Sequence, residues 1–253
     1  MKVRIDKLLV ERGVAASRER AQAMVLAGRV LVNGQKIEKA GAGVDPDSEL
    51  RLLGEDPKYV SRGGLKLEAA IRRWSIDLSG RTCIDVGAST GGFTDCMLQH
   101  GAARVIAIDT GYGQIAAQLR SDACVTLLER TNARYLTAQQ LQEAGLDRTA
   151  SFAAIDVSFI SVTLVLPAVI AAAFTASSQR ERELVVLIKP QFEVGRHLVG
   201  KGGIVRDAAA QQGAVEKVRD SVERLGGSEI EVIESPLLGM EGNREFLLHT
   251  GFK

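Results

Sequence analysis

Seven short apolar segments in the last two-thirds of the chain constrain its fold more than any other feature of the sequence. Helical patterns lie between them, notably at Gly92–Gln99, Val162–Phe174 and Ala208–Leu225. Strands that alternate with helices in this way favour a parallel sheet covered on both faces. The segments that we expect as strands are Thr82–Val86, Arg104–Ile108, Cys124–Leu127, Phe152–Asp156, Leu184–Ile188, Glu229–Ile233 and Glu245–His249.

The last predicted strand follows a short loop, not a crossover helix. Parallel strands need a long crossover connection, so we expect this strand to be antiparallel to its neighbour. The sequence therefore predicts an α/β fold with a seven-stranded, Rossmann-like sheet whose last strand is antiparallel. We expect this unit to span residues 63–253, after a linker at 57–62.

Residues 1–56 differ in character from the rest of the chain. Their apolar residues recur at helical spacing, and Ser17 stands where a helix N-cap belongs. Asn33-Gly34, directly after Val30–Val32, is a strong signal for a β-hairpin. We therefore expect a small α+β domain made of two helices and a hairpin.

The formal net charge of the 253 residues is only +1, which by itself argues against a nucleic-acid binder. The charge is unevenly distributed, however. Residues 1–40 hold nine lysines and arginines against four acidic residues, residues 41–56 are acidic, and residues 57–75 are basic again. Such asymmetry between parts of one chain points to nucleic acid or membrane as a partner.

Cysteine usage and hydropathy narrow the class of protein. Cys83, Cys96 and Cys124 are widely spaced and fit neither a disulfide framework nor a zinc site, so we expect a reduced cytoplasmic protein without a bound metal. No signal-peptide pattern is present. The longest apolar stretch, Val162–Ala176, contains Pro167 and is too short to span a bilayer.

A glycine-rich turn follows the first predicted strand, with glycines at 87, 91 and 92. The helix that follows presents free N–H groups, and Asp109 ends the next strand where an acidic side chain can bind two ribose hydroxyls. These features predict a nucleoside cofactor. The G-x-x-x-G-G spacing suits S-adenosylmethionine, whereas an NAD fingerprint is matched weakly and a purely structural turn is the third interpretation.

Charged residues end two neighbouring predicted strands, Asp156 the fourth and Lys189 the fifth. The carboxyl ends of parallel strands face the crevice where ligands bind. A helix-capping aspartate and a lysine that reaches solvent are the structural alternative.

The sequence around these residues distinguishes between methyl acceptors. Val-Ser-Phe follows Asp156, not the Pro-Pro-aromatic sequence of enzymes that methylate base nitrogens. No cysteine nucleophile is expected at the rim, which disfavours a pyrimidine carbon. Lysines suit a ribose hydroxyl, because a nearby cation stabilises the developing alkoxide.

Several segments together carry a family resemblance that covers essentially the whole chain. They are Arg4–Val10, Ser17-Arg18, Ala21-Gln22, Val32–Gly34, Tyr59–Leu67, Asp85–Asp95 and Lys189–Glu193. The chain resembles the TlyA/hemolysin A-type rRNA methyltransferases. These join an RNA-binding domain of the ribosomal protein S-four type to an FtsJ-like, S-adenosylmethionine-dependent 2′-O-methyltransferase domain. The N-terminal segments alone are shared by many RNA-binding proteins.

The resemblance implies a site and a reaction. FtsJ-like enzymes use a Lys-Asp-Lys-Glu tetrad, which falls here on Lys66, Asp156, Lys189 and Glu245. In the implied mechanism Asp156 and Glu245 hold Lys189, while Lys66 supplies a second cation. The expected acceptor is a ribose 2′-hydroxyl of cytidine in large-subunit rRNA, and the resemblance allows small-subunit rRNA as a further substrate. The implied cofactor contacts are Asp85, Gly87, Ala88, Ser89, Thr90, Gly91, Gly92, Phe93, Asp109 and Asn132.

Basic residues are candidate contacts to RNA phosphates, which position a protein without reading sequence. A solvated charged face is the alternative interpretation. We expect residues 192–205, with four glycines, to be a structureless mobile loop that closes over RNA. The candidates are Arg4, Lys7, Arg12, Arg18, Arg20 and Arg29 in the first domain and Arg62, Arg196 and Lys201 in the second.

Two other classes of function compete with this hypothesis. One is a non-enzymatic RNA-binding or ribosome-assembly factor, against which the complete tetrad argues. The other is a membrane-active hemolysin, against which the lack of a predicted membrane span argues. We expect ribosomal RNA or a ribosomal subunit as the partner and no membrane. The sequence leaves the oligomeric state open, with a monomer favoured.

Overall fold

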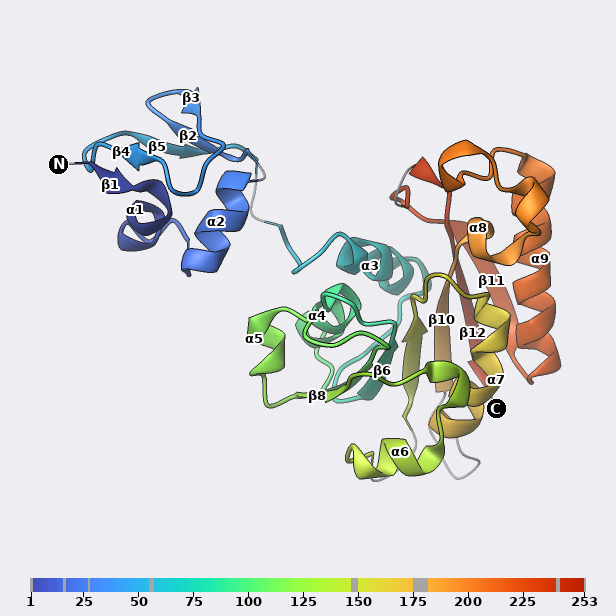
Figure 1. Cartoon of the computed structure of the whole chain (residues 1–253). Helices are drawn as coiled ribbons and strands as arrows, with labels where there is room; N and C mark the ends of the chain where they lie inside the picture. The colour runs from blue at the N-terminus through green and yellow to red at the C-terminus, as the bar shows by residue number, and fades with distance from the viewer. Residues whose placement is uncertain are drawn as a thin grey trace. The chain divides into compact units, whose positions relative to one another are not determined.

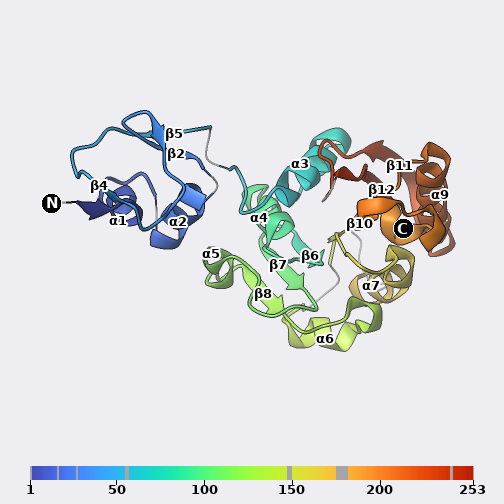
Figure 2. The same cartoon turned by 45° about the horizontal axis from the view of Figure 1, so that its top comes forward.

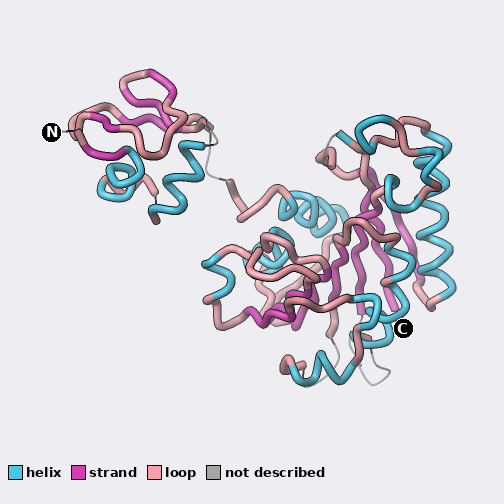
Figure 3. Tube along the Cα trace, viewed as in Figure 1, coloured by secondary structure: helices cyan, strands magenta, loops and turns pink. Residues whose placement is uncertain are grey.

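The computed structural model describes residues 2–15, 17–26, 28–54, 57–146, 150–174, 182–239 and 242–252. The chain divides into two compact units, residues 1–57 and residues 58–253. Figure 3 shows that the first unit combines helices with short strands, whereas the second is built around one large sheet. Within the described ranges, no helix is both long and apolar enough to cross a membrane.

The first unit packs helices α1 (Ile5–Glu11) and α2 (Arg18–Leu26) beside short antiparallel strands (Figure 1). The Ser17 hydroxyl accepts the N–H of Arg20 at 3.2 Å, as expected of an N-cap. The predicted hairpin turn is confirmed, since Asn33 and Gly34 both have positive φ, at 50° and 78°. The strands are β1 (Val3–Arg4) paired with β4 (Gly43–Val44), and β3 (Gln35–Lys36), β2 (Val30–Val32) and β5 (Leu50–Leu52) in that order.

A buried carboxylate organises this unit. Asp6, which is fully buried, accepts hydrogen bonds from Arg4 at 2.8 and 3.0 Å, from Arg18 at 3.1 Å and from Gln22 at 3.0 Å. These donors hold the pKa of Asp6 far below its usual range, chiefly through Arg4. Asp6 thereby connects the first strand with both helices.

The second unit contains a seven-stranded sheet in the order β11-β12-β10-β9-β6-β7-β8 (Figures 1 and 2). Strand β12 lies antiparallel between β10 and β11, and the other pairs are parallel, so the expected antiparallel last strand is confirmed. The strands are β6 (Thr82–Val86), β7 (Arg104–Ile108), β8 (Val125–Leu128), β9 (Phe152–Ile155), β10 (Arg182–Ile188), β11 (Ser228–Glu234) and β12 (Phe246–Phe252).

Alternate residues of the strands enter two cores, one on each face of the sheet. Cys83 packs with helices α3 (Gly63–Trp74) and α4 (Gly92–Gln99), whereas Ile84 belongs to the larger core. That core includes α6 (Ala138–Glu143), α7 (Leu166–Ala173) and α9 (Ala208–Arg224). The short helices α5 (Ala117–Arg120) and α8 (Pro190–Glu193) complete the unit.

Two local expectations are wrong. The pattern at 162–174 is not one helix but a 3-10 turn, Val162–Leu164, followed by α7, because Pro167 favours a helix start at that point. Residues 192–205 are not structureless, since they include 3-10 turns at Arg196–Leu198 and Lys201–Gly203. The Asn243 side chain fixes this stretch by donating to the carbonyl of Gly203 and accepting from the N–H of Val205.

The segment 57–62, expected as a linker, contributes to the core of the second unit. Tyr59 is buried with α3 and α4. A Cβ added at Gly64 would lie 2.3 Å from the ring of Tyr59, so the helix can approach this ring only with glycine there.

Replacing Asp6 should make the stability of the first unit less sensitive to acid. The pKa of Asp6 is lower in the folded than in the unfolded chain, so its contribution to stability is present above about pH 4 and is lost as the pH falls. We expect Asp6→Asn to cost about 2 kcal/mol at pH 7 and less at pH 3. Urea unfolding followed by the amide NMR signals of Leu8 and Leu9 measures both values. An equal cost at both pH values would contradict the role of the charge.

Candidate active site

Two cavities meet at the carboxyl ends of the parallel strands. The larger, about 490 Å³, contains all four residues of the predicted tetrad and is named here the tetrad cavity. The smaller, about 320 Å³, contains Asp109 and is named the Asp109 cavity. Both are lined by Gly87, Ser89, Asp156, Ser158 and Phe159, so they adjoin along this shared wall.

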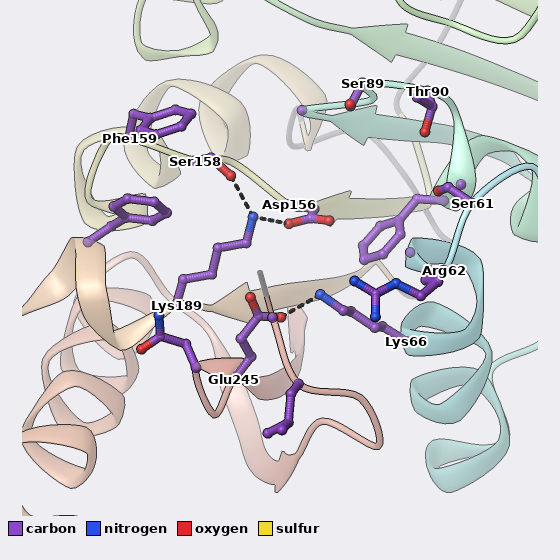
Figure 4. Close-up of a pocket in the computed structure, with 18 of the residues that line it drawn as sticks. Ser61, Arg62, Lys66, Ser89, Thr90, Asp156, Ser158, Phe159, Lys189 and Glu245 are labelled. Atoms are coloured by element: carbon purple, nitrogen blue, oxygen red, sulfur yellow. Dashed lines mark hydrogen bonds and ion pairs between the residues drawn. The ribbon is translucent and has the colours of Figure 1, made fainter. Parts of the chain in front are cut away.

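Two ion pairs dominate the tetrad cavity (Figure 4). Lys66 Nζ lies 2.5 Å from Glu245 Oε2, and Lys189 Nζ lies 2.6 Å from Asp156 Oδ1. The side-chain exposures of these four residues lie between 2% and 20%, so each ammonium is neutralised by a carboxylate in a mostly buried site. Helix α3 supplies Lys66, while Asp156 and Lys189 follow β9 and β10 and Glu245 precedes β12.

The pairing differs from the expected one. Glu245 was expected to bind Lys189, but it forms its ion pair with Lys66, 179 residues away in the sequence. The second partner of Lys189 is the Ser158 hydroxyl at 2.7 Å (Figure 4), a residue not predicted as part of the site. The Asp-Val-Ser-Phe sequence contains this serine, but its role depends on a lysine from the neighbouring strand.

The glycine-rich turn has a different physical basis from the expected one. A Cβ at Gly87 would lie 2.4 Å from the carbonyl oxygen of Asp156, and one at Gly91 would lie 2.3 Å from Leu119. A Cβ at Gly92 would lie 2.2 Å from the Ser61 hydroxyl. These glycines therefore permit close packing inside the protein. The predicted contacts that line the tetrad cavity are Gly87, Ala88, Ser89, Thr90, Gly92 and Phe93.

Asp85, predicted as a cofactor contact, lies beneath this turn. It is completely buried and lines neither cavity. Gly91, another predicted cofactor contact, also lines neither cavity. One carboxylate oxygen of Asp85 accepts the Thr94 hydroxyl at 2.6 Å, and the other has no hydrogen-bond partner among the described residues. Burial, with added repulsion from Asp156 and Asp109, raises the pKa of Asp85 to about 7.

Asp109 is held in a fixed orientation in its cavity. One carboxylate oxygen accepts the N–H of Ser89 at 2.7 Å and the other accepts the N–H of Gly111 at 2.6 Å. Each oxygen can accept a second hydrogen bond, so the carboxylate can bind a vicinal diol. Asn132 lines the same cavity and caps the following turn by accepting the N–H of Arg134. Thr110, Gln114 and Thr131, which also line it, were not predicted.

The aromatic side chains of Phe159 and Phe192 line the tetrad cavity. Phe159 is 92% exposed and has a φ of 66°, which is rare for a residue other than glycine. The ring centroids of Phe159 and Phe192 are 5.4 Å apart. Neither ring was predicted as a separate site residue. An exposed aromatic ring on a strained backbone beside a cavity indicates a ligand-contacting role.

The predicted RNA contacts occupy different environments. Arg4 and Arg18 bind Asp6 but keep 47% of their side chains exposed. Arg12 and Arg29 donate to backbone carbonyls, at Ser48 and Leu53 among others, and Arg20 is half-buried. These arginines therefore stabilise the first unit as well as adding charge. Lys7, Arg62, Arg196 and Lys201 are exposed, and Arg62 lines the tetrad cavity.

Known proteins similar to this chain include RNA methyltransferases. Residues 59–252 match the FtsJ-like methyltransferase family and residues 3–50 match the S4 domain. The 16S/23S rRNA (cytidine-2′-O)-methyltransferase TlyA of Mycobacterium tuberculosis is 41% identical over 98% of this chain and 89% of its own length. Hemolysin A of Brachyspira hyodysenteriae is 37% identical, over 98% and 99% respectively. A solved structure from Streptococcus thermophilus that carries the name hemolysin is 41% identical, with a TM-score of 0.73 over 100% of this chain and 89% of that one.

Removing the charge of Asp85 should change how stability depends on pH. Because its folded-state pKa of about 7 exceeds the unfolded value of about 3.9, wild-type stability should fall as the pH rises from 4 to 7. We expect Asp85→Asn to remove this slope and to be the more stable protein at pH 8, by a few kcal/mol at about 1.4 kcal/mol per pKa unit. Urea unfolding followed by the fluorescence of Trp74, in α3, measures it. Parallel pH profiles for both proteins would contradict the assignment.

Proposed function

The chain belongs to the FtsJ-like methyltransferase family, and within it to the TlyA/hemolysin A rRNA methyltransferases, and on this premise we propose that it methylates a ribose 2′-hydroxyl of ribosomal RNA, using S-adenosylmethionine. The observation that carries the proposal is the presence of two lysine–carboxylate pairs in a cavity that adjoins the Asp109 cavity. The family names favour a cytidine as the target. A ribosomal RNA substrate favours a cytoplasmic location for this activity.

The residues of the two cavities fit the cofactor. S-Adenosylmethionine, when bound, supplies a methyl group on a positively charged sulfur. Asp109 would hold the ribose hydroxyls with the lone pairs that Ser89 and Gly111 leave free. Ser89 and Thr90 line the tetrad cavity and offer hydroxyls for the amino-acid end of the cofactor.

The ion pairs can orient and stabilise the reacting oxygen. Lys189 has one N–H donor left after its contacts with Asp156 and Ser158, so it can hold the 2′-oxygen by a hydrogen bond. As the hydroxyl gives up its proton, the ammonium groups of Lys189 and Lys66 stabilise the developing negative charge. Asp156 lines both cavities and is the carboxylate placed to accept the hydroxyl hydrogen. Orientation of the reacting groups can lower the barrier by about 7–11 kcal/mol. General-base assistance contributes ~10²–10⁴-fold in rate, which is only about 3–5 kcal/mol.

Phe159 can bind the base of the target nucleotide. RNA-modifying proteins recognise unpaired bases by stacking them on aromatic rings. The Phe159 ring is almost fully exposed at the wall of the tetrad cavity, with Phe192 beside it. Arg62, which lines the same cavity, and the S4 domain provide positive charge for the RNA backbone.

Lys189→Met should abolish methylation but leave cofactor binding intact. The variant keeps the aliphatic stem and removes the ammonium group, so transfer should fall by ~10³-fold or more. Transfer of tritiated methyl groups from S-adenosylmethionine to ribosomal subunits measures activity, and calorimetry measures cofactor affinity. Lys58→Met is the matched control, because Lys58 pairs with Glu68 outside both cavities. Activity retained in Lys189→Met would refute the proposed mechanism.

Phe159→Ala should weaken RNA binding more than cofactor binding. Loss of one stacked base costs about 1–3 kcal/mol, so the KM for ribosomal subunits should rise by roughly 5- to 150-fold. Phe159→Trp should restore most of the loss, since it keeps an aromatic face. Unchanged steady-state kinetics in Phe159→Ala would exclude a stacking role.

A further inference from the structure

Glu193, the last residue of α8, is a buried carboxylate that lines neither cavity. It is only 7% exposed, yet each of its carboxylate oxygens has a donor. Oε1 accepts the N–H of Val162 at 2.7 Å, and Oε2 accepts the hydroxyl of Ser161 at 2.5 Å. The ammonium of Lys217, from α9, lies 3.1 Å from Oε2 and also donates to the backbone carbonyl of Glu193 at 2.8 Å. The pair therefore joins three segments that are distant in sequence.

These contacts close a ring of interactions around the catalytic lysine. Lys189 leads directly into α8, which ends at Glu193. Glu193 binds Ser161, and the chain runs back from there to Ser158 and Asp156, which both bind Lys189. Residues 156–161 are consequently anchored at both ends, since the N–H of Asp156 also donates to the carbonyl of Val86 at 2.8 Å.

The backbone of this segment needs such anchoring. Phe159 has a φ of 66°, and a non-glycine residue keeps this conformation only where its surroundings enforce it. Ser161 is the N-cap residue of the 3-10 turn, but its side chain makes no capping hydrogen bond. The Glu193 carboxylate caps the turn instead, by accepting the N–H of Val162. A buried carboxylate is stable only with a compensating charge, which Lys217 supplies.

We propose that Glu193, together with Lys217, is a positioning residue for methyl transfer. The pair fixes residues 156–161 so that the Ser158 hydroxyl stays on Lys189 and the Phe159 ring stays at the cavity wall. This inference rests on the proposed function. Asp109 and residues 87–90, which supply the proposed polar contacts to the cofactor, lie outside the ring, so we expect cofactor binding to change less than methyl transfer.

The test uses the full chain with ribosomal subunits as substrate. We expect Glu193→Gln and Lys217→Met to lower kcat by roughly 10²-fold, because small misplacements of reacting groups cost about that much. The Kd for S-adenosylmethionine should stay within about threefold. Lys217→Arg should restore most of the activity because it keeps the positive charge. If Glu193→Gln does not fold, Lys217→Met carries the same comparison.

A control and a double-mutant cycle separate positioning from stability alone. Glu183→Gln is the control. Glu183 lies on β10, six residues before Lys189, and is a partly buried carboxylate bound by Arg81 and His249. This variant should leave kcat unchanged. In a Ser158→Ala background, Glu193→Gln should cause little further loss of kcat, since both changes act on the same contact.

Two results would overturn the inference: a kcat within twofold of wild type in Glu193→Gln, or losses that multiply in the double variant. Either would leave the proposed function standing if the wild-type protein transfers methyl groups. Failure of the wild-type protein to transfer any methyl group would instead refute the proposed function.

Discussion

Two ammonium groups share one largely buried cavity, and the site depends on how their charge is balanced. A buried lysine is stable as a cation only beside a carboxylate, and a carboxylate there needs donors in turn. Asp156 and Glu245 meet this requirement for Lys189 and Lys66. Each side chain comes from a different element, so the sheet order and the placement of α3 are what bring opposite charges together. The positive charge is thereby retained close to where negative charge must develop.

Much of the fold follows from the sequence because strand periodicity is a local property. Five expected strands differ from the observed ones by at most one residue at either end, and the expected limits of α4 are the observed ones. The stretch at 192–205 was misjudged because its glycines are visible locally, whereas Asn243, which fixes it, lies about 40 residues later. No local pattern shows that a distant side chain holds a loop.

The candidate site, like the fold, is predictable from the sequence only in part. The residue types of the tetrad follow from motifs, but the choice of partner does not, because it depends on the reach of side chains across the folded cavity. Glu245 therefore binds Lys66, and Ser158 takes the place expected for Glu245 on Lys189. The glycines at 87, 91 and 92 were predicted for ligand approach, whereas contacts within the protein already require them. A motif identifies positions where a side chain is constrained, and only the structure shows by what.

The position of β12 affects the order in which the second unit can assemble during synthesis. This strand follows all the others in sequence, yet it lies between β10 and β11 and pairs with both. Until it emerges from the ribosome, β10 and β11 each expose an unpaired edge, which is prone to association with other chains. Glu245 directly precedes β12, so Lys66 remains without its carboxylate for the same interval. A nascent chain of this protein therefore cannot complete its site until translation has passed β12.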